Sequence, residues 1–425
     1  MARIYLADKE TLDSTHANTN AILAALEESG GEHKKAVRYG IKINKSDSGK
    51  KSRVTYLYDA VGMTPAAMNY TDGTFNYGSW GNVEFVKNNY PCMVKFDGTE
   101  DYKLLATNYA LKADGTTASD AANVDYAGNA MAAFMGGWLC QYETATDEYI
   151  IWSNVKYDAA YNAYHRTGKD GTLNAGFYRH IYTPSLVGNA ARSLSGCQTI
   201  GNMTAEQENE ACKANGDKWA MSSWWEWNYI ICLLKIMAKT EDLQEAYGNG
   251  NMSGYVNDST KYYGVLASGS MDDKGQFYGY NAGNKQIKVF HTEAMWGDQW
   301  ERICQMVCDK GVVKVQPYGD CNLTGAGFEK VLDFADYGVS GSVGGYMKDT
   351  VMTKAGRFPV TYTGSSSTYL CDYFWLNTGI VAVPLVGGDC VNGLSCGAGV
   401  SVNSTAGGAS WGIAPGLSCK MPNAA

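Results

Sequence analysis

Residues 222–250, SSWWEWNYIICLLKIMAKTEDLQEAYGNG, have the strongest helical pattern in the chain. Apolar side chains recur at the spacing of one helix face, at Trp227, Ile230, Ile231, Leu234 and Met237. Ser222 or Ser223 can cap the first turn, where Glu226 can reach back to unpaired amides. The sequence Gly-Asn-Gly at 248–250 can end the helix, because glycine accepts the left-handed backbone found there. We therefore expect a helix over residues 222–247.

Two other segments also have helical spacing. In residues 296–308 one apolar face would contain Trp300, Ile303, Cys304 and Val307. This spacing predicts a second short helix in which Cys304 and Cys308 are neighbouring thiols. Near the start of the chain, spacings of three and four separate Leu12, Thr15, Thr19, Ile22 and Leu26. Residues 1–35 are therefore predicted to be an N-terminal helical segment, which either supports self-association through a coiled-coil-like seam or packs on its own domain.

Strand patterns dominate the region that follows. Residues 38–43 and 53–58 alternate apolar and polar side chains, and residues 149–155 give a further strand. Asp-Gly pairs at 72–73, 97–98 and 114–115 are turn signals. The sequence therefore predicts an α+β protein with a segment 1–35, a β-rich region 36–125 and a main domain 126–425.

Composition and charge exclude several kinds of partner. The 425-residue chain carries a net charge of −8, which gives no electrostatic reason to expect nucleic acid or an anionic membrane. The longest apolar run, residues 229–234, is too short to span a bilayer. The first ten residues have no apolar core, so we expect synthesis without a secretory signal. Twelve cysteines spread through such a chain are expected to be free buried thiols.

No motif for catalysis, cofactor binding or metal binding is evident. His16 and His33 are expected in solvent, whereas His165, His180 and His291 have no nucleophile motif beside them. The chain lacks zinc-finger spacing, a phosphate-binding glycine loop before a helix, and an EF-hand loop. We therefore expect a protein that is not an enzyme and needs no cofactor.

A set of carboxylates leaves one enzymatic alternative open. Paired acidic side chains can hydrolyse glycosidic bonds, and five are available at Glu226, Asp272, Asp273, Glu293 and Asp298. The Asp-Asp-Lys-Gly sequence at 272–275 is more simply a polar turn.

The C-terminal stretch, residues 385–420, differs in composition from the rest. After Asp372 the only charged side chains are those of Asp389 and Lys420, and Gly, Ser, Ala and Val dominate. Short strands joined by glycine turns fit this composition better than helices do. A stretch with so little charge is either buried or is a surface built for contact.

Side-chain alternation divides this stretch into two sets. Backbone turns or close approach are expected at Gly387, Gly388, Gly393 and Gly397. The inward set is predicted to be Ala398, Val400, Val402, Trp411, Ile413 and Leu417. The predicted ligand-contacting surface comprises Asp389, Val391, Leu394, Ser395, Gly399, Ser401, Asn403, Ser404, Gly408, Ser410 and Gly412, with Cys390 as a further candidate. These side chains are small and weakly polar, which predicts a shallow patch with modest affinity per site.

Several blocks of residues, in this order, carry a family resemblance. They are residues 224–231 (WWEWNYII), 269–279 (GSMDDKGQFYG), 289–300 (VFHTEAMWGDQW), 385–388 (LVGG), 396–398 (CGA) and 411–414 (WGIA), and upstream residues 38–59 and 192–196. The chain resembles C-type-lectin-fold proteins of gut bacteriophages, in the long form of the formylglycine-generating-enzyme type. Its end is similar to the variable proteins of diversity-generating retroelements. The resemblance covers most of the chain and is weak before Tyr39.

The resemblance implies an α+β scaffold that presents residues 385–420 as a variable ligand surface. In that family, mutagenesis at template adenines yields many residues but never Lys, Glu, Gln, Met or Trp. Between Val386 and Gly416 those residues are absent, except for Trp411 at a position where the family keeps a scaffold Trp. A Gly/Ser/Ala-rich β segment would lack them as well.

This chain departs from the motifs that give related proteins two properties, calcium-dependent glycan binding and copper binding. Calcium-binding lectin loops of the Glu-Pro-Asn or Gln-Pro-Asp type are missing, so calcium-dependent glycan binding is not carried over. Cys390 and Cys396 lie where oxidase-like relatives bind copper, but no other copper-site feature accompanies them.

The leading hypothesis is therefore a phage virion adhesin, such as a tail fibre protein, that binds a protein or glycan receptor on a bacterial surface. The resemblance implies a homotrimer, in which several weak sites gain avidity on one cell. The alternatives are a virion enzyme that degrades surface glycan through its carboxylates, and a structural virion protein that binds no host ligand.

Overall fold

The strands that alternation predicts near the N-terminus form one antiparallel sheet. Strands β1 (Arg38–Asn44), β2 (Val54–Tyr58) and β10 (Asp147–Ser153) coincide with the three predicted strands. With β9 (Trp138–Glu143) they give the order β2-β1-β10-β9. The computed structural model describes residues 35–423, so the helix predicted within residues 1–35 lies outside the described part.

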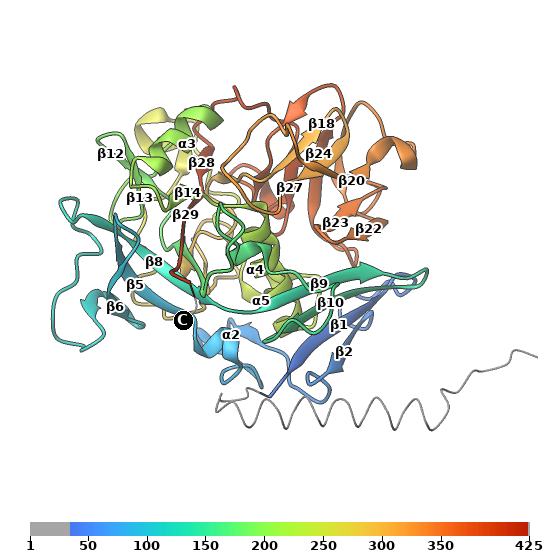
Figure 1. The fold of residues 1–425 in the computed structure, drawn as a ribbon, viewed down its shortest axis with the longest axis horizontal. Coiled ribbons are helices and arrows are strands. Elements are labelled where there is room, and N and C mark those ends of the chain that lie inside the picture. Colours follow the sequence, from blue (N-terminus) through green and yellow to red (C-terminus); the bar gives the residue numbers. More distant parts are fainter. Residues whose placement is uncertain (1–34, 424–425) are drawn as a thin grey trace, which may run out of the picture. The chain divides into compact units, whose positions relative to one another are not determined.

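A seven-stranded sheet joins the last strand to strands from the first half of the chain, in the order β14-β29-β11-β8-β5-β6-β7 (Figure 1). Its strands are β5 (Tyr90–Lys95), β6 (Glu100–Leu105), β7 (Asn108–Lys112), β8 (Gly128–Met135), β11 (Gly176–His180), β14 (Trp219–Met221) and β29 (Leu417–Lys420). The last strand, β29, lies between β11 and β14 and pairs antiparallel with both. The C-terminal strand is therefore an interior part of a sheet that begins near residue 90.

The predicted boundary at residue 125 is wrong. Strand β1 pairs with β10 and strand β5 pairs with β8, so strands from both sides of that position share sheets. Residues from Arg38 onward form one compact unit. Long-range pairing of this kind leaves no trace in the local composition on which the boundary was based.

Helix α4 (Trp224–Ala238) lies in the middle of this unit, between β9 and β10 on one side and the C-terminal strands on the other (Figure 1). As predicted, Ser223 caps it, and Glu226 completes the reciprocal bond to the Ser223 amide. Every residue of α4 is buried, which its predominantly apolar sequence allows.

The single helix predicted to Tyr247 is divided into two. The chain leaves α4 at Lys239, whose backbone is left-handed, and Asp242 caps a new helix, α5 (Leu243–Tyr247). The predicted end at Gly248 is correct. The polar residues between the helices have other partners, since Glu241 forms ion pairs with Lys235 and Arg357.

A six-stranded mixed sheet contains most of the C-terminal part, in the order β21-β24-β27-β26-β17-β28. Its strands are β17 (Trp300–Arg302), β21 (Ser342–Tyr346), β24 (Tyr373–Asn377), β26 (Leu385–Val386), β27 (Val400–Val402) and β28 (Ile413–Pro415). The β24–β27 and β17–β28 pairs are parallel, and the other pairs are antiparallel. A four-stranded sheet, β20-β19-β18-β25, consists of β18 (Met306–Asp309), β19 (Val312–Val315), β20 (Glu329–Asp333) and β25 (Val381–Ala382).

The helix predicted over residues 296–308 is wrong, because the segment contains β17 and the start of β18. Left-handed backbones at Asp298 and Gln305 interrupt any helix there. The segment is buried on all sides, so apolar residues at helical spacing need not share one face. Cys304 and Cys308 therefore do not lie on one helix. Cys304 forms an isolated β-bridge with Ser223, whereas Cys308 lies in β18 and pairs with Val313 of β19.

The remaining described elements are short. The paired strands are β3 (Ala67–Asn69) with β4 (Thr74–Asn76), β12 (Ser185–Val187) with β13 (Ala190–Arg192), β15 (Lys288–Val289) with β16 (Thr292–Glu293), and β22 (Thr350–Thr353) with β23 (Gly356–Pro359). The helices are α2 (Glu84–Lys87) and α3 (Ala205–Lys213), with 3₁₀ turns η1 (Tyr164–Arg166), η2 (Ser259–Gly264), η3 (Phe334–Tyr337) and η4 (Gly393–Ser395). The three predicted Asp-Gly turns are confirmed, since Gly73, Gly98 and Gly115 have φ of 73°, 80° and 76°. The protein thus has a β-rich α+β fold, and no described helix is long and apolar enough to cross a membrane.

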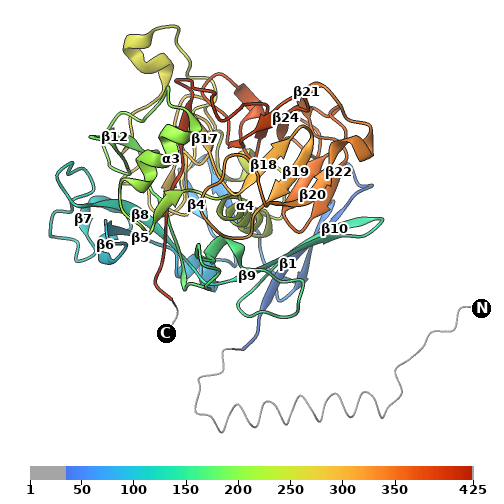
Figure 2. The same ribbon diagram turned by 45° about the horizontal axis from the view of Figure 1, so that its top comes forward.

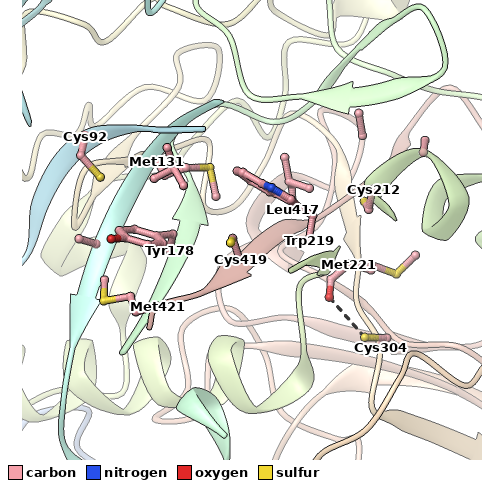
Figure 3. Packing of buried hydrophobic residues seen from close by; sticks show 14 of the residues in the cluster. Cys92, Met131, Tyr178, Cys212, Trp219, Met221, Cys304, Leu417, Cys419 and Met421 are labelled. Carbon is pink, nitrogen blue, oxygen red and sulfur yellow. Dashed lines mark hydrogen bonds between the residues drawn. The ribbon is translucent and has the colours of Figure 1, made fainter. Parts of the chain in front are cut away.

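A buried cluster anchors β29 to the rest of the seven-stranded sheet. Figure 3 shows Leu417 and Cys419 of β29 beside Trp219, with Met221 and Cys304 at one end of the cluster. All twelve cysteines of the chain are free, as predicted, and all are buried except the partly exposed Cys197 and Cys321.

Candidate ligand-binding surface

The predicted contact residues fall partly on two exposed loops. The first loop, residues 387–399, follows β26 and presents Val391 and Leu394, which are 52% and 48% exposed. Asp389 and Ser395 are partly exposed on the same loop. The second loop, residues 403–412, presents Asn403 as exposed and Ser404, Gly408 and Ser410 as partly exposed. These positions are available to a ligand.

Three predicted contact residues are buried instead, so the prediction that they face outward is wrong. Ser401 is 3% exposed because β27 is an interior strand whose two faces are both covered, as the burial of all three of its residues shows. Gly399 is buried, and a glycine has no side chain that could contact a ligand. Gly412 is buried against the Asp389 carboxylate, and its carbonyl accepts a hydrogen bond of 2.8 Å from the Trp300 amide. Alternation fails here because it assumes a strand with one solvated face.

The predicted turn and core positions are largely confirmed. Left-handed φ angles of 90°, 82°, 59° and 97° occur at Gly387, Gly388, Gly393 and Gly397. The inward set is buried, namely Ala398, Val400, Val402, Ile413 and Leu417. Trp411 is the exception, since it is partly exposed.

A loop from a distant part of the sequence packs against the first C-terminal loop. The Tyr255 amide donates to the Cys390 carbonyl at 3.2 Å, and the Cys390 thiol donates to the Tyr263 carbonyl at 3.5 Å. The Gly393 amide also donates to the Met252 carbonyl at 2.7 Å. Figure 2 shows this segment, which contains η2, in yellow at the top of the view beside the dark red C-terminal loops.

Aromatic stacking connects the same segment to the second C-terminal loop. The Trp411 ring stacks on Tyr263 and Tyr255, with centroid separations of 4.9 Å and 5.7 Å. Tyr255 and Tyr262 are 42% and 54% exposed. We call Tyr255, Tyr262, Tyr263, Asp389, Val391 and Trp411 together the tyrosine surface.

Two adjacent residues of the tyrosine surface have a strained backbone. Tyr262 and Tyr263 have φ of 49° and 57°, and the left-handed region costs a residue with a Cβ roughly 1–2 kcal/mol. Asp258 holds this geometry, because its side chain caps the Thr260 amide and its carbonyl accepts from the Tyr263 amide at 3.0 Å. Strain maintained by surrounding bonds is common at ligand-binding loops.

The buried carboxylate of Asp298 holds the segment that contains η2 through hydrogen bonds. Asp298 accepts hydrogen bonds from the Asn251 and Gln286 side chains, at 2.7 and 2.9 Å, and from the Leu266 amide at 2.9 Å. The Asn251 side chain also donates to the Gly264 carbonyl at 3.0 Å, which joins Asp298 to the end of η2. Burial raises the pKa of Asp298 to about 6.

Asp389 is the charged side chain of the tyrosine surface. Its carboxylate accepts a hydrogen bond of 3.1 Å from the Val391 amide and lies against Gly412. Burial raises the pKa of Asp389 to about 6, and the hydrogen bond opposes that shift. This group therefore changes charge just below neutral pH.

Four of the five carboxylates considered for glycan hydrolysis have internal partners. Glu226 accepts hydrogen bonds from Ser418 and Lys420. Asp298 accepts hydrogen bonds from Asn251, Leu266 and Gln286. Glu293 accepts from the Gly269 and Met271 amides at 2.8 and 3.0 Å, and Asp272 accepts from Tyr182 and Ser195. The fifth, the exposed Asp273, pairs with Lys274.

The described histidines and possible metal ligands do not suggest a catalytic centre. His165, His180 and His291 are buried, and burial lowers the pKa of each. Within residues 35–423 no group of three or more His, Cys, Asp or Glu side chains is placed to hold a metal ion. His16 and His33 lie outside the described residues.

No protein-family model matches this chain, and no curated protein matches it significantly. Interpretation of the tyrosine surface therefore depends on its own geometry and on the sequence resemblance. Tyr255, Tyr262 and Tyr263 were not predicted as contact residues, because they lie in a segment rich in Gly, Asn and Ser that has no clear strand or helix pattern.

Proposed function

We propose that this chain is a receptor-binding protein that uses the tyrosine surface and the adjoining C-terminal loops to attach a phage virion to a bacterial surface. The observation that carries the proposal is the convergence of exposed aromatic side chains from residues 255–263 on the predicted C-terminal loops. Aromatic residues supply most of the binding energy at many protein interfaces. The proposal extends to a C-type-lectin-like scaffold, which the sequence resemblance supports.

The composition of the surface favours binding over catalysis. Tyr and Trp rings stand among Ser, Gly and Asn, the combination found in antibody binding loops, where rigid rings make contact and small polar groups adapt. Exposed Val391 and Leu394 add apolar area at its edge. The hydrogen bonds that Asp258 accepts and the one that Asn251 donates fix residues 258–264 before a ligand arrives, which reduces the entropy lost on binding.

The arrangement also suits variation at the binding loops, the second part of the proposal. Asn403, Ser404 and Ser410 reach solvent, so substitutions there leave the packed sheet intact. Ser401, in contrast, is enclosed by β24 and β26. We therefore propose that diversification, together with display on a homotrimer, alters the exposed loop positions and leaves β27 unchanged.

A cell-binding assay tests the proposal. Fluorescently labelled protein is incubated with the bacterial strains that the source phage infects, and bound protein is measured by flow cytometry. Replacing Tyr255 and Tyr262 with Ser should remove most of the binding while the thermal midpoint changes little. The matched control is Tyr337→Ser, a similarly exposed tyrosine in η3 outside the tyrosine surface.

Two outcomes would contradict the proposal. Full binding by the double tyrosine variant would show that another surface makes the contact. Release of reducing sugar ends from host polysaccharide, lost on Glu293→Gln, would favour the glycan-degrading alternative instead.

A further inference from the structure

A cavity remote from the residues of the tyrosine surface opens beside the start of α4. Its volume is about 530 Å³, and apolar side chains of Met221, Cys304 and Met421 form part of its wall. The polar part of the wall includes Glu226 and Lys420, which form an ion pair. A cavity of this size admits a small molecule.

Two cysteine thiols line this cavity together. Cys304 belongs to the buried cluster of Figure 3, and Cys321 packs against that cluster from the loop after β19. The Cys321 thiol is near enough to raise the pKa of Cys304, whose own thiol donates to the Met221 carbonyl at 3.4 Å, and both cysteines are free. Cys321 is partly exposed, whereas Cys304 is buried.

The backbone around each thiol is held in place. The Cys304 amide donates to the Ser222 carbonyl, and its own carbonyl accepts from the Trp224 amide, both at 2.9 Å. On the opposite loop, Gln305 donates to the Gly319 carbonyl at 3.2 Å, and Lys169 forms an ion pair of 2.9 Å with Asp320. These bonds hold the backbone at Cys304 and at the two residues just before Cys321, which keeps both thiols at the cavity wall.

We propose that Cys304 and Cys321 are a modification site, at which a small organic disulfide entering the cavity oxidises the pair to an intramolecular disulfide. The bond would tie the loop that carries Cys321 to the start of α4. It would form after the protein leaves a reducing cytosol, and it is independent of receptor binding.

The chemistry balances with the small disulfide as the oxidant. The more accessible Cys321 loses its proton and attacks one sulfur of the reagent, which releases one small thiolate and leaves a mixed disulfide. Cys304 then loses its proton to solvent and attacks the Cys321 sulfur, which releases the second small thiolate. Both cysteines are oxidised, the reagent is reduced to two thiols, and the two protons complete those thiols.

Access of a reagent from solvent distinguishes the Cys304–Cys321 pair from the other cysteines. Cys390 and Cys396 also lie near each other, but both are fully buried, so neither thiol can make the first attack on a reagent that arrives from solvent. Cys197 is the other partly exposed thiol, and the residues lining the cavity do not include it. We therefore expect selective oxidation of one pair among the twelve cysteines.

Peptide mapping of the full chain tests the proposal. The reduced protein is incubated with oxidised glutathione, its remaining thiols are alkylated, and digests are analysed by mass spectrometry. The expected result is a peptide pair joined between Cys304 and Cys321, with the thermal midpoint raised by about 3 °C and restored by dithiothreitol. Cys197→Ser, the matched control, should give the same joined pair.

Two serine variants test the two steps of the oxidation separately. Cys304→Ser should stop at a glutathione adduct on Cys321, and Cys321→Ser should leave Cys304 unmodified. A persistent glutathione adduct on Cys321 in the natural chain, without the joined pair, overturns the proposal, as does an unmodified Cys321. Because Cys321 is not buried, its variant should fold even if replacement of Cys304 prevents folding.

Discussion

The loops and the strands of the C-terminal stretch share one composition and have opposite environments. Gly, Ser, Val and Ala fill both, yet β27 is enclosed in a sheet while residues 389–395 and 403–410 reach solvent. The small side chains have a different effect in the strand and in the loops. In the strand it permits close packing between neighbouring strands, and in the loops it leaves space for a ligand and for substitution.

The largest expected effect would come from enlarging a buried strand position. Ser401→Tyr places a ring on the covered sheet face beside Trp375 of β24 and Leu385 of β26, where the serine is 3% exposed. We expect the free energy of unfolding to fall by about 3 kcal/mol, because the packed sheet cannot accept the added volume. Urea denaturation measures this, and an unchanged midpoint would mean that Ser401 faces solvent after all.

The second prediction separates binding from stability in the loops. Tyr262→Gly should weaken cell binding by roughly 30-fold, the loss of an aromatic contact worth about 2 kcal/mol. Glycine also relieves the left-handed strain at φ of 49°, so the free energy of unfolding should rise by about 0.5 kcal/mol. Binding titration and urea denaturation on the same variant check both parts; a joint loss of binding and stability would assign Tyr262 to the core.

A third, smaller effect concerns the loop carboxylate. The pKa of Asp389 is raised by burial from its ordinary 3.8 to about 6, so the folded state binds this proton more tightly than the unfolded state does. The resulting stabilisation is present below about pH 4 and is lost as the pH rises through about 6. Asp389→Asn should remove a pH dependence of about 1 kcal/mol over this range, after allowance for solvent screening. Parallel slopes for both proteins would show that Asp389 does not titrate in this way.

The smallest effect should be found two residues beyond Ser401. Asn403→Tyr is expected to lower the free energy of unfolding by at most about 1 kcal/mol, because position 403 is exposed and only the acceptor of the Ser401 hydroxyl is lost. Measured beside Ser401→Tyr, it gives a direct comparison of loop and strand with the same introduced side chain. Equal losses would indicate that the loop is packed as tightly as the sheet.

The parts predicted correctly from sequence are those that depend on neighbours in the chain. Ser223 and Glu226 mark the start of α4, and the Asp-Gly pairs mark turns, since their hydrogen bonds and backbone angles are local. The helix predicted over residues 296–308 failed because burial on every side imitates helical periodicity. The tyrosine surface depends on the stacking of Trp411 with Tyr255 and Tyr263, which lie far apart in sequence, so no local pattern could predict it.

Strand β29 has a consequence for how the chain is made. It fills the place between β11 and β14, so the seven-stranded sheet is incomplete until the ribosome has released residues 417–420. These residues follow both C-terminal loops, and a shifted reading frame or early stop within the loops deletes the strand. Only chains translated in frame through the loops can close the sheet, and unfinished ones keep an open strand edge that proteases can attack. Closure of the sheet by β29 therefore depends on in-frame translation of the loops that precede it.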